Sequence, residues 1–220
     1  MKFYTNGDSF IAGMECLGDS NRSNKNKEFS FPKILCEKLQ CSQYINNAYN
    51  GASNDFIFNT SIADLIELKK TSDEEIFAVI GWSSLTRVAC CIPSRSNEFI
   101  DYNVTFVNPM CQTPETKHIL PLITTAFWGD QLLAMSQAAR ISAMHHFLKS
   151  NNIRHIFVNT CGRHDYNMLE HIPNFYTTDI FQQYVVNRYP QELRKEHHCS
   201  PIPHKMFGNM LFDFIVTNQL

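Results

Sequence analysis

The chain has 220 residues, of which 44% are hydrophobic and 18% charged, so it is long enough for one well-buried domain and has an ordinary globular composition. Its 19 Lys and Arg residues nearly balance 21 Asp and Glu, and a net charge of -2 argues against a protein that coats nucleic acid. No stretch approaches the roughly 20 apolar residues of a membrane span, and polar residues follow Met1 almost at once, so we expect no signal peptide, no membrane partner and a cytoplasmic location.

Cysteine is the unusual component, with eight residues at positions 16, 36, 41, 90, 91, 111, 161 and 199. Because no secretion signal is visible, we expect reduced and mostly buried thiols rather than a disulfide framework. Zinc sites use Cys or His ligands in close pairs. Only Cys90 and Cys91 come that near, and neighbouring residues of a strand point to opposite faces. The sequence therefore predicts no metal and no cofactor.

In chain order, the first expected element is a strand over residues 2–5, followed by apolar residues with helix-compatible spacing over 9–16. A polar loop over 18–27 leads to an amphipathic helix over 31–39, which Pro32 opens at a position that needs no N–H donor. A second strand over 43–48 and the clearest early helix, over 53–70, come next.

The second half begins with an apolar run of strand length over 75–80, as expected for a central parallel strand. Residues 85–110 are mixed, and the part over 100–107 alternates like an exposed strand or hairpin. A long helical region over 113–149 is expected to break near Trp128-Gly129-Asp130. The last expected elements are a buried strand over 153–159 and a closing helix over 206–215.

Strands that alternate with helices predict an α/β protein with a mostly parallel central sheet and helices on both faces. We expect a single domain over residues 1–220, a three-layer α/β/α sandwich of the flavodoxin-like kind. Neither a repeat nor a linker interrupts the sequence. An insertion at about residues 85–130 is expected to form a lid over the site.

Ligands of such sheets bind outside the carboxyl ends of the strands. Small hydrogen-bonding residues follow all four expected strands. Among them, Ser9 is the natural nucleophile, because it lies at the positive end of an expected helix. A plain helix cap would use the same residue type. The sequence also repeats Gly-Asp-Ser at residues 18–20 with no strand before it, so the position of Ser9 carries more weight than the tripeptide.

Four blocks follow one another along the chain: Asn6-Gly7-Asp8-Ser9-Phe10, Gly51 within residues 47–54, Gly81-Trp82-Ser83-Ser84, and a C-terminal His before a helix. In this order they resemble the SGNH (GDSL-type) hydrolase superfamily, and the third block is similar to that of phage-type members. They span nearly the whole chain. The resemblance implies the three-layer SGNH fold, a Ser9 nucleophile and a histidine base near the C-terminus. It also implies an oxyanion hole made by the Ser9 N–H, the Gly51 N–H and a third side chain.

The third block departs from the family pattern Gly-x-Asn-Asp, whose Asn donates to the oxyanion. Ser83 takes that place, and a hydroxyl can donate but reaches less far. Removing one such donor costs about 10²–10³ in rate. Asn54, one helical turn past Gly51, is the alternative donor.

The fourth block departs as well, because the family reads Asp-x-x-His and Lys195 stands three residues before His198. We predict His198 as the base, with His204 as the alternative. The nearest acid to His198 in sequence is Glu196, which would orient it if the loop bends. The other arrangement is a dyad in which a backbone carbonyl holds the imidazole.

Further residues are expected to line a substrate-binding crevice: Asp8, Asn54, Trp82, Ser84, Arg87 and His204. Arg87 could hold a phosphate or carboxylate group in a bidentate manner or be a solvated charge. Cys161 and Cys199 fall in expected crevice loops. His145 and His146, in the middle of the long helix, are expected at the surface.

Two functions follow from these residues. The first is a serine hydrolase of esterase or deacetylase type that acts on a small soluble ester through an acyl-enzyme on Ser9. An acyltransferase would use the same site. The second is a non-hydrolytic binding protein, associated with a virion or acting in a host cytoplasm, which the altered third and fourth blocks favour. The sequence does not indicate the acyl group or the oligomeric state.

Overall fold

The computed structural model describes residues 1–18, 24–85, 87–93, 102–107, 130–162, 166–194 and 198–220. A sheet of five parallel strands in the order β2-β1-β3-β6-β7 forms its centre. The strands are β1 (Lys2–Asn6), β2 (Gln43–Asn46), β3 (Ile76–Trp82), β6 (Arg154–Asn159) and β7 (Phe175–Tyr176). The four strands expected from the sequence are confirmed, and the two-residue β7 is an addition.

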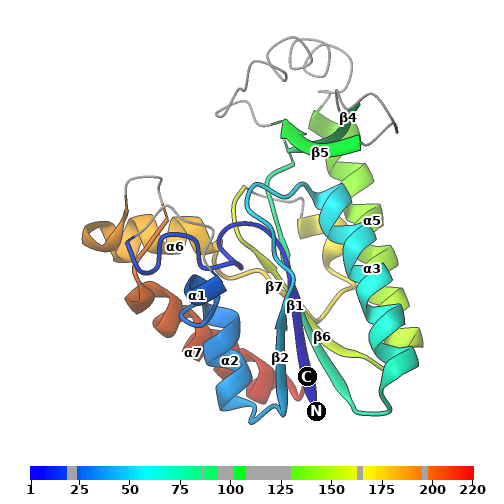
Figure 1. The fold of residues 1–220 in the computed structure, drawn as a ribbon, viewed down its shortest axis with the longest axis horizontal. Coiled ribbons are helices and arrows are strands. Elements are labelled where there is room, and N and C mark those ends of the chain that lie inside the picture. Colours follow the sequence, from blue (N-terminus) through cyan, green and yellow to red (C-terminus); the bar gives the residue numbers. More distant parts are fainter. Residues whose placement is uncertain (19–23, 86, 94–101, 108–129, 163–165, 195–197) are drawn as a thin grey trace.

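Helices cover both faces of this sheet (Figure 1). On one face lie α2 (Phe31–Lys38), α6 (Phe181–Arg188) and α7 (Pro201–Asn218), with the short α1 (Asn24–Lys27) near them. On the other face lie α3 (Asn54–Thr71) and α5 (Asp130–Ser150). Short 3₁₀ turns occupy Tyr166–Leu169 and Pro190–Glu192. This is the predicted three-layer α/β/α arrangement.

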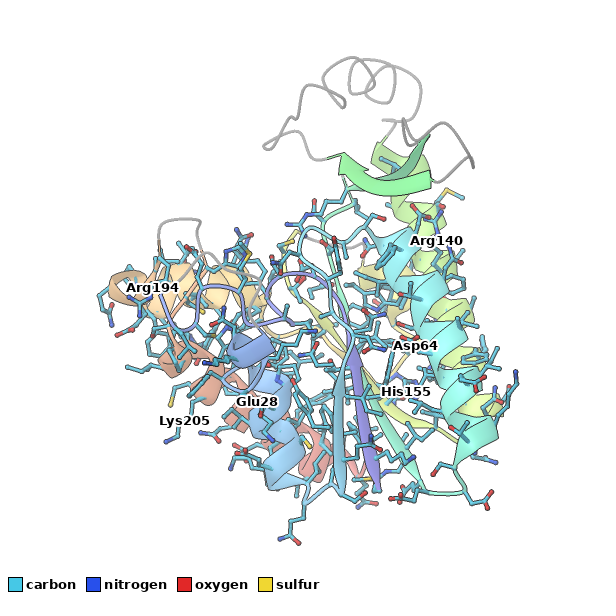
Figure 2. The ribbon with its side chains drawn as sticks, viewed as in Figure 1. Glu28, Asp64, Arg140, His155, Arg194 and Lys205 are labelled. Atoms are coloured by element: carbon cyan, nitrogen blue, oxygen red, sulfur yellow. The ribbon has the colours of Figure 1, made fainter. Side chains whose placement is uncertain are left out.

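The alternation of side chains along the central strands divides the core into two clusters. Phe3 of β1 packs with Phe77 and Val79 of β3 against α2, α6 and α7, whereas Tyr4 points to the other cluster under α3 and α5. The Tyr4 hydroxyl donates to Asp64 Oδ2 at 2.7 Å, and Asp64 points from α3 toward the sheet in Figure 2. Since both faces of the central strands are buried, their sequences read as continuous apolar runs.

The segment after β1 differs from the expected helix over 9–16. It makes successive turns, in which the Ala12 N–H donates to the Asp8 carbonyl at 3.0 Å. Gly13 and Glu15 then take φ values of 67° and 61°, in the left-handed region that ends a right-handed helix. The prediction of a helix was therefore wrong, because apolar spacing alone does not reveal where the backbone reverses its hand.

Two other differences concern helix ends and a missed helix. The closing helix α7 begins at Pro201, because Ser200 caps it by accepting from the Ile202 N–H at 3.3 Å and Pro fits the first turn. Helix α6 was not predicted. It is only eight residues long and has no side-chain cap, so it carries few of the usual sequence signals.

An antiparallel hairpin of β4 (Val88–Pro93) and β5 (Tyr102–Val107) follows β3 and lies beyond the carboxyl ends of the parallel strands (Figure 1). It confirms the expected hairpin over part of 85–110. Residues 108–129, which contain the first part of the expected helical region and the rest of the expected insertion, lie outside the described residues, so the lid stays a prediction. No helix in the part that the structure describes is long and apolar enough to cross a membrane.

His145 lies in the core and not at the surface as expected. Its Nδ1 is 2.9 Å from His155 Nε2, and His155 Nδ1 is 2.9 Å from the Ile153 carbonyl. A carbonyl can only accept, so His155 Nδ1 carries its proton, its Nε2 accepts, and His145 Nδ1 donates. Burial lowers the pKa of His155 and, helped by the neighbouring charge of His155, lowers that of His145 to about 4. Figure 2 marks His155 on the side of the sheet covered by α3 and α5.

Candidate active site

The turn that carries Ser9 rests directly on the end of β3. A Cβ added to Gly7 would lie 2.4 Å from Ile11 Cγ1 and 2.9 Å from the Gly81 carbonyl oxygen. A Cβ on Gly81 would lie 2.4 Å from the same Ile11 atom. The glycines of the first and third blocks therefore make room for one buried side chain, Ile11, which fixes the turn against the sheet.

Side chains of Asn6 and Asp8 hold the backbone on either side of Gly7. Asn6 Oδ1 accepts from the Gly7 N–H at 2.8 Å, while its Nδ2 donates to Thr60 and Ser61 of α3. Asp8 Oδ1 accepts from the Phe10 N–H at 3.0 Å, which is an Asx turn around Ser9. Ser9 thus lies in a fixed turn and not, as predicted, at the start of a full helix.

Ser9 and His198 meet at hydrogen-bond distance, although they lie near opposite ends of the chain. Ser9 Oγ is 2.7 Å from His198 Nε2. The Ser9 residue is 4% exposed and the His198 side chain 11%, so the pair is largely shielded from bulk water. The Phe10 ring, 4.9 Å away between centroids, packs against the imidazole.

The backbone around His198 is held on both sides. The Arg194 N–H donates to the His198 carbonyl at 2.8 Å, and an isolated antiparallel bridge joins Leu193 to Cys199. The next residue, Ser200, donates from its N–H to the Glu192 carbonyl at 3.1 Å and from its hydroxyl to the Glu192 carboxylate. The start of α7 therefore positions the histidine that precedes it.

The acid beside the imidazole is Glu15. Its Oε2 lies 3.4 Å from His198 Nδ1, and its side chain is only 5% exposed. Glu15 has a φ of 61°, at the end of the turn that carries Ser9. We had expected Glu196, which lies outside the described residues. Spacing around His198 could not reveal Glu15, because the acid comes from the opposite end of the chain.

Asp8 joins the ends of three strands beneath the site. It is fully buried, and its Oδ2 accepts from Thr160 Oγ1 at 2.9 Å and from Cys161 Sγ at 3.3 Å, both after β6. From the segment after β3, Ser83 Oγ donates to the same oxygen at 3.1 Å and Arg87 Nη1 at 3.0 Å. A buried carboxylate requires such donors and a cation, so Asp8 is a structural group rather than the substrate-binding residue that was predicted.

The same contacts revise the predictions for Arg87 and Ser83. The Arg87 side chain, 13% exposed, binds Asp8 Oδ2 and donates from Nη1 to Ser83 Oγ at 2.8 Å, so its cation neutralises an internal carboxylate. The Ser83 hydroxyl lies 3.1 Å from Asp8 Oδ2 and 3.6 Å from Cys161 Sγ, so it has hydrogen-bond partners inside the protein. These contacts compete with the predicted role of Ser83 as third donor of an oxyanion hole.

Asn54 holds the backbone of Ser83 through a reciprocal pair of hydrogen bonds. Its Oδ1 accepts from the Ser83 N–H at 2.7 Å, and its Nδ2 donates to the Ser83 carbonyl at 2.9 Å. Asn54 is 4% exposed at the start of α3. The Asn54 side chain therefore fixes the third block to α3. This structural role accounts for an asparagine at this position without the predicted contact to substrate.

Trp82 and His204 belong to the core and not to the crevice. Trp82 is fully buried and packs edge-on against Phe157. His204 is also buried, its Nδ1 accepts from the Phe31 N–H at 3.2 Å, and its ring packs against Phe181. Burial lowers the pKa of His204 to about 3 and keeps it neutral. Both predictions failed because chain position does not determine which way a side chain points. Ser84 is half-buried beside Gly162, and its role in substrate binding stays a prediction.

The two cysteines expected in crevice loops are buried as well. Cys161 points at Asp8, and burial together with that carboxylate raises the pKa of its thiol to about 11. Cys199 follows the base directly, yet its side chain is turned into the core, and burial raises its pKa. Thiols of this kind are poor nucleophiles at neutral pH.

The N–H groups of Ser9 and Gly51 are the backbone donors that the sequence resemblance implies for an oxyanion hole. Within the described residues, neither the Ser9 nor the Gly51 amide donates a hydrogen bond. Gly51 has a φ of 77°, a conformation that suits glycine. Its loop is joined to the nucleophile turn by a bond from the Tyr49 N–H to the Gly7 carbonyl at 3.0 Å. The described residues contain no group of three or more His, Cys, Asp or Glu side chains that could hold a metal ion.

No protein-family model matches the sequence, and no curated protein is significantly similar to it. Solved structures do share the fold. A protein assigned to the lipolytic G-D-S-L family of Desulfitobacterium hafniense DCB-2 superposes with a TM-score of 0.53 at 15% identity, over 97% of this chain and 98% of that one. The psychrotrophic esterase EstA of Pseudoalteromonas sp., in a structure inhibited by monoethylphosphonate, gives 0.53 at 9% identity, over 98% and 97%. The chain therefore has the α/β/α fold of the SGNH (GDSL) hydrolases.

Proposed function

We propose that the protein is a serine hydrolase of esterase or deacetylase type, which acts on a small soluble ester or acylated substrate. The observation that carries the proposal is the 2.7 Å contact between Ser9 Oγ and His198 Nε2. A nucleophile within hydrogen-bond reach of a base, with the base itself next to a third group, is the arrangement of covalent acyl transfer. Glu15 supplies that third group.

In the first half-reaction, His198 Nε2 takes the proton of Ser9 as Oγ attacks the carbonyl carbon. The protonated imidazole is then stabilised by the Glu15 carboxylate next to Nδ1. The proton passes to the leaving alcohol or amine, and an acyl group stays on Ser9. Water, activated by the same nitrogen, releases the acid and restores the enzyme.

The oxyanion that forms in each step would lie at the N–H groups of Ser9 and Gly51. Ser83 Oγ is engaged with Asp8 and Arg87 in this structure, so we count only the two backbone donors. One donor is worth about 10²–10³ in rate, so we expect a slower enzyme than a three-donor site would give. An acyltransferase would share these steps and differ only in the acceptor of the acyl group.

A fluorophosphonate probe tests the proposal, because it phosphonylates an activated serine irrespective of the natural acyl group. We expect labelling of the wild type and none of Ser9→Ala or His198→Ala. Ser20→Ala, in the second Gly-Asp-Ser tripeptide, is the matched control and should label like the wild type. Hydrolysis of p-nitrophenyl acetate by the same variants gives a second readout.

The alternative is a non-hydrolytic binding protein on the same fold. Its specific support is the Ser83 hydroxyl, whose contact with Asp8 weakens the oxyanion hole. Folded wild-type protein that gives no Ser9-dependent adduct would exclude the hydrolase and favour this alternative.

A further inference from the structure

The C-terminal end of α2 is closed by a Schellman motif whose two end residues are both cysteines. Gln40 has a φ of 52°, and its N–H donates to the Glu37 carbonyl at 3.1 Å. The Cys41 N–H donates to the Cys36 carbonyl, also at 3.1 Å. In this motif the side chains at the two ends of the six-residue turn contact each other, and usually both are apolar. Here both of these positions are cysteines.

The two thiols differ in their surroundings. Cys36 is buried in the core cluster shared by α2 and α7, whereas Cys41 is half-exposed at the edge of that cluster. The interaction between the two thiols lowers the pKa of Cys41 and raises that of Cys36, and the positive charges of the N-terminal ammonium and of Arg154 also lower the pKa of Cys41. One partner is thus prepared to lose its proton, and the other to keep it.

Cys16 and Cys199 provide an internal comparison, because they too lie near each other. Both are buried, and burial raises the pKa of both, that of Cys16 to about 12. The five cysteines whose side chains the structure describes are free thiols. Among them, Cys41 alone combines access to solvent with a lowered pKa.

We propose that Cys36 and Cys41 form a peroxide-reactive dithiol that closes to a reversible intrachain disulfide. The Cys41 thiolate attacks one oxygen of hydrogen peroxide, which gives a sulfenic acid at Cys41 and releases hydroxide. The Cys36 sulfur then attacks the Cys41 sulfur, the S–O bond breaks, and the thiol proton leaves with the hydroxyl as water. Both sulfurs are oxidised, the peroxide is reduced to two molecules of water, and a dithiol reductant reverses the reaction.

The turn geometry favours closure. A disulfide needs two Cα atoms within about 4–7 Å, and a six-residue turn closed by a hydrogen bond between its ends brings them together. Cys36 lies in the last turn of α2 and Cys41 just before β2, at the amino edge of the sheet, whereas Ser9 follows the carboxyl end of β1. The proposal therefore does not depend on the proposed hydrolase activity.

The test treats the folded full-length protein with one equivalent of hydrogen peroxide, blocks the remaining thiols with N-ethylmaleimide and maps the peptides by mass spectrometry. We expect a cross-link between Cys36 and Cys41 with the loss of two hydrogen atoms, reversed by dithiothreitol. In Cys36→Ser, dimedone should trap a sulfenic acid at Cys41. Cys41→Ser should react at neither position. Cys16→Ser is the matched control and should still form the cross-link.

A second measurement needs no variant. Iodoacetamide at neutral pH should alkylate Cys41 in the native protein at least about tenfold faster than Cys16 or Cys199. Alkylation of Cys41 no faster than of those buried thiols would overturn the proposal. So would oxidation that stops at Cys41 or that joins Cys16 to Cys199 in its place.

Discussion

Glu15 makes the strongest prediction at the scale of single residues. Glu15→Gln keeps the shape of the side chain and removes the charge beside His198 Nδ1. If Glu15 orients the imidazole and stabilises its protonated form, the rate of ester hydrolysis and of fluorophosphonate labelling should fall by about 10²–10⁴. Glu37→Gln, at an exposed ion pair on α2, is the control and should leave both rates unchanged.

A double variant distinguishes this role from a general loss of structure. Groups that act as a unit are not additive, so Glu15→Gln should cause no further loss of the residual p-nitrophenyl acetate hydrolysis that remains in the His198→Ala background. Equal rates for Glu15→Gln and the wild type would mean that His198 works in a dyad without this carboxylate.

At the scale of elements, Asp8 connects the segments after β1, β3 and β6, and the Arg87 guanidinium is the cation that compensates its charge. Arg87→Met leaves a buried carboxylate without its cation and should lower the free energy of unfolding by about 3–5 kcal/mol. Urea denaturation measures this loss. Arg140→Met breaks the more exposed 2.6 Å pair with Asp55 and should cost only about 0–1 kcal/mol.

A double-mutant cycle with Asp8→Asn tests whether Arg87 stabilises the fold through Asp8. If it does, the decrease in the free energy of unfolding in the double variant should be smaller than the sum of the decreases in the two single variants. A strictly additive double variant would show that Arg87 acts on stability without Asp8.

The sequence predicted the elements of the sheet well, because a parallel strand buried on both faces reads as a short apolar run, as in residues 76–80. It did not predict the turn after Ser9, where two positive φ values interrupt helical spacing. It placed Ser9 and His198 at the same edge of the sheet, and the structure brings them together. The acid could not be found in this way, since the contact of Glu15 with His198 depends on tertiary structure.

At the scale of the whole molecule, the buried histidines predict a fold that loses stability in acid. The pKa of His145 is lowered to about 4 and that of His204 to about 3, while histidines of an unfolded chain titrate near 6.5. As the pH falls from about 6.5 toward these values, the unfolded state binds more protons than the folded state, so stability decreases. Above about pH 6.5 this contribution is fully present.

Urea denaturation at pH 7, 5.5 and 4.5 measures the slope of the free energy of unfolding against pH. His145→Gln should reduce it by up to about 1.4 kcal/mol per pH unit, because one proton-uptake site is removed. His146→Gln, the exposed neighbour on α5, should keep the wild-type slope. A slope that is the same in all three proteins would mean that His145 does not contribute to the loss of stability in acid.

The location of Glu15 has a consequence for how such a site can change over time. In the proposed mechanism, the nucleophile and the acid belong to one stretch of seven residues, Ser9 to Glu15, so a shift of this stretch moves both together. The C-terminal segment then has to deliver only an imidazole, held by the cap of α7. In the proposed mechanism the residues just before His198 need not supply an acid, so substitutions there are expected to leave the arrangement of Ser9, His198 and Glu15 unchanged.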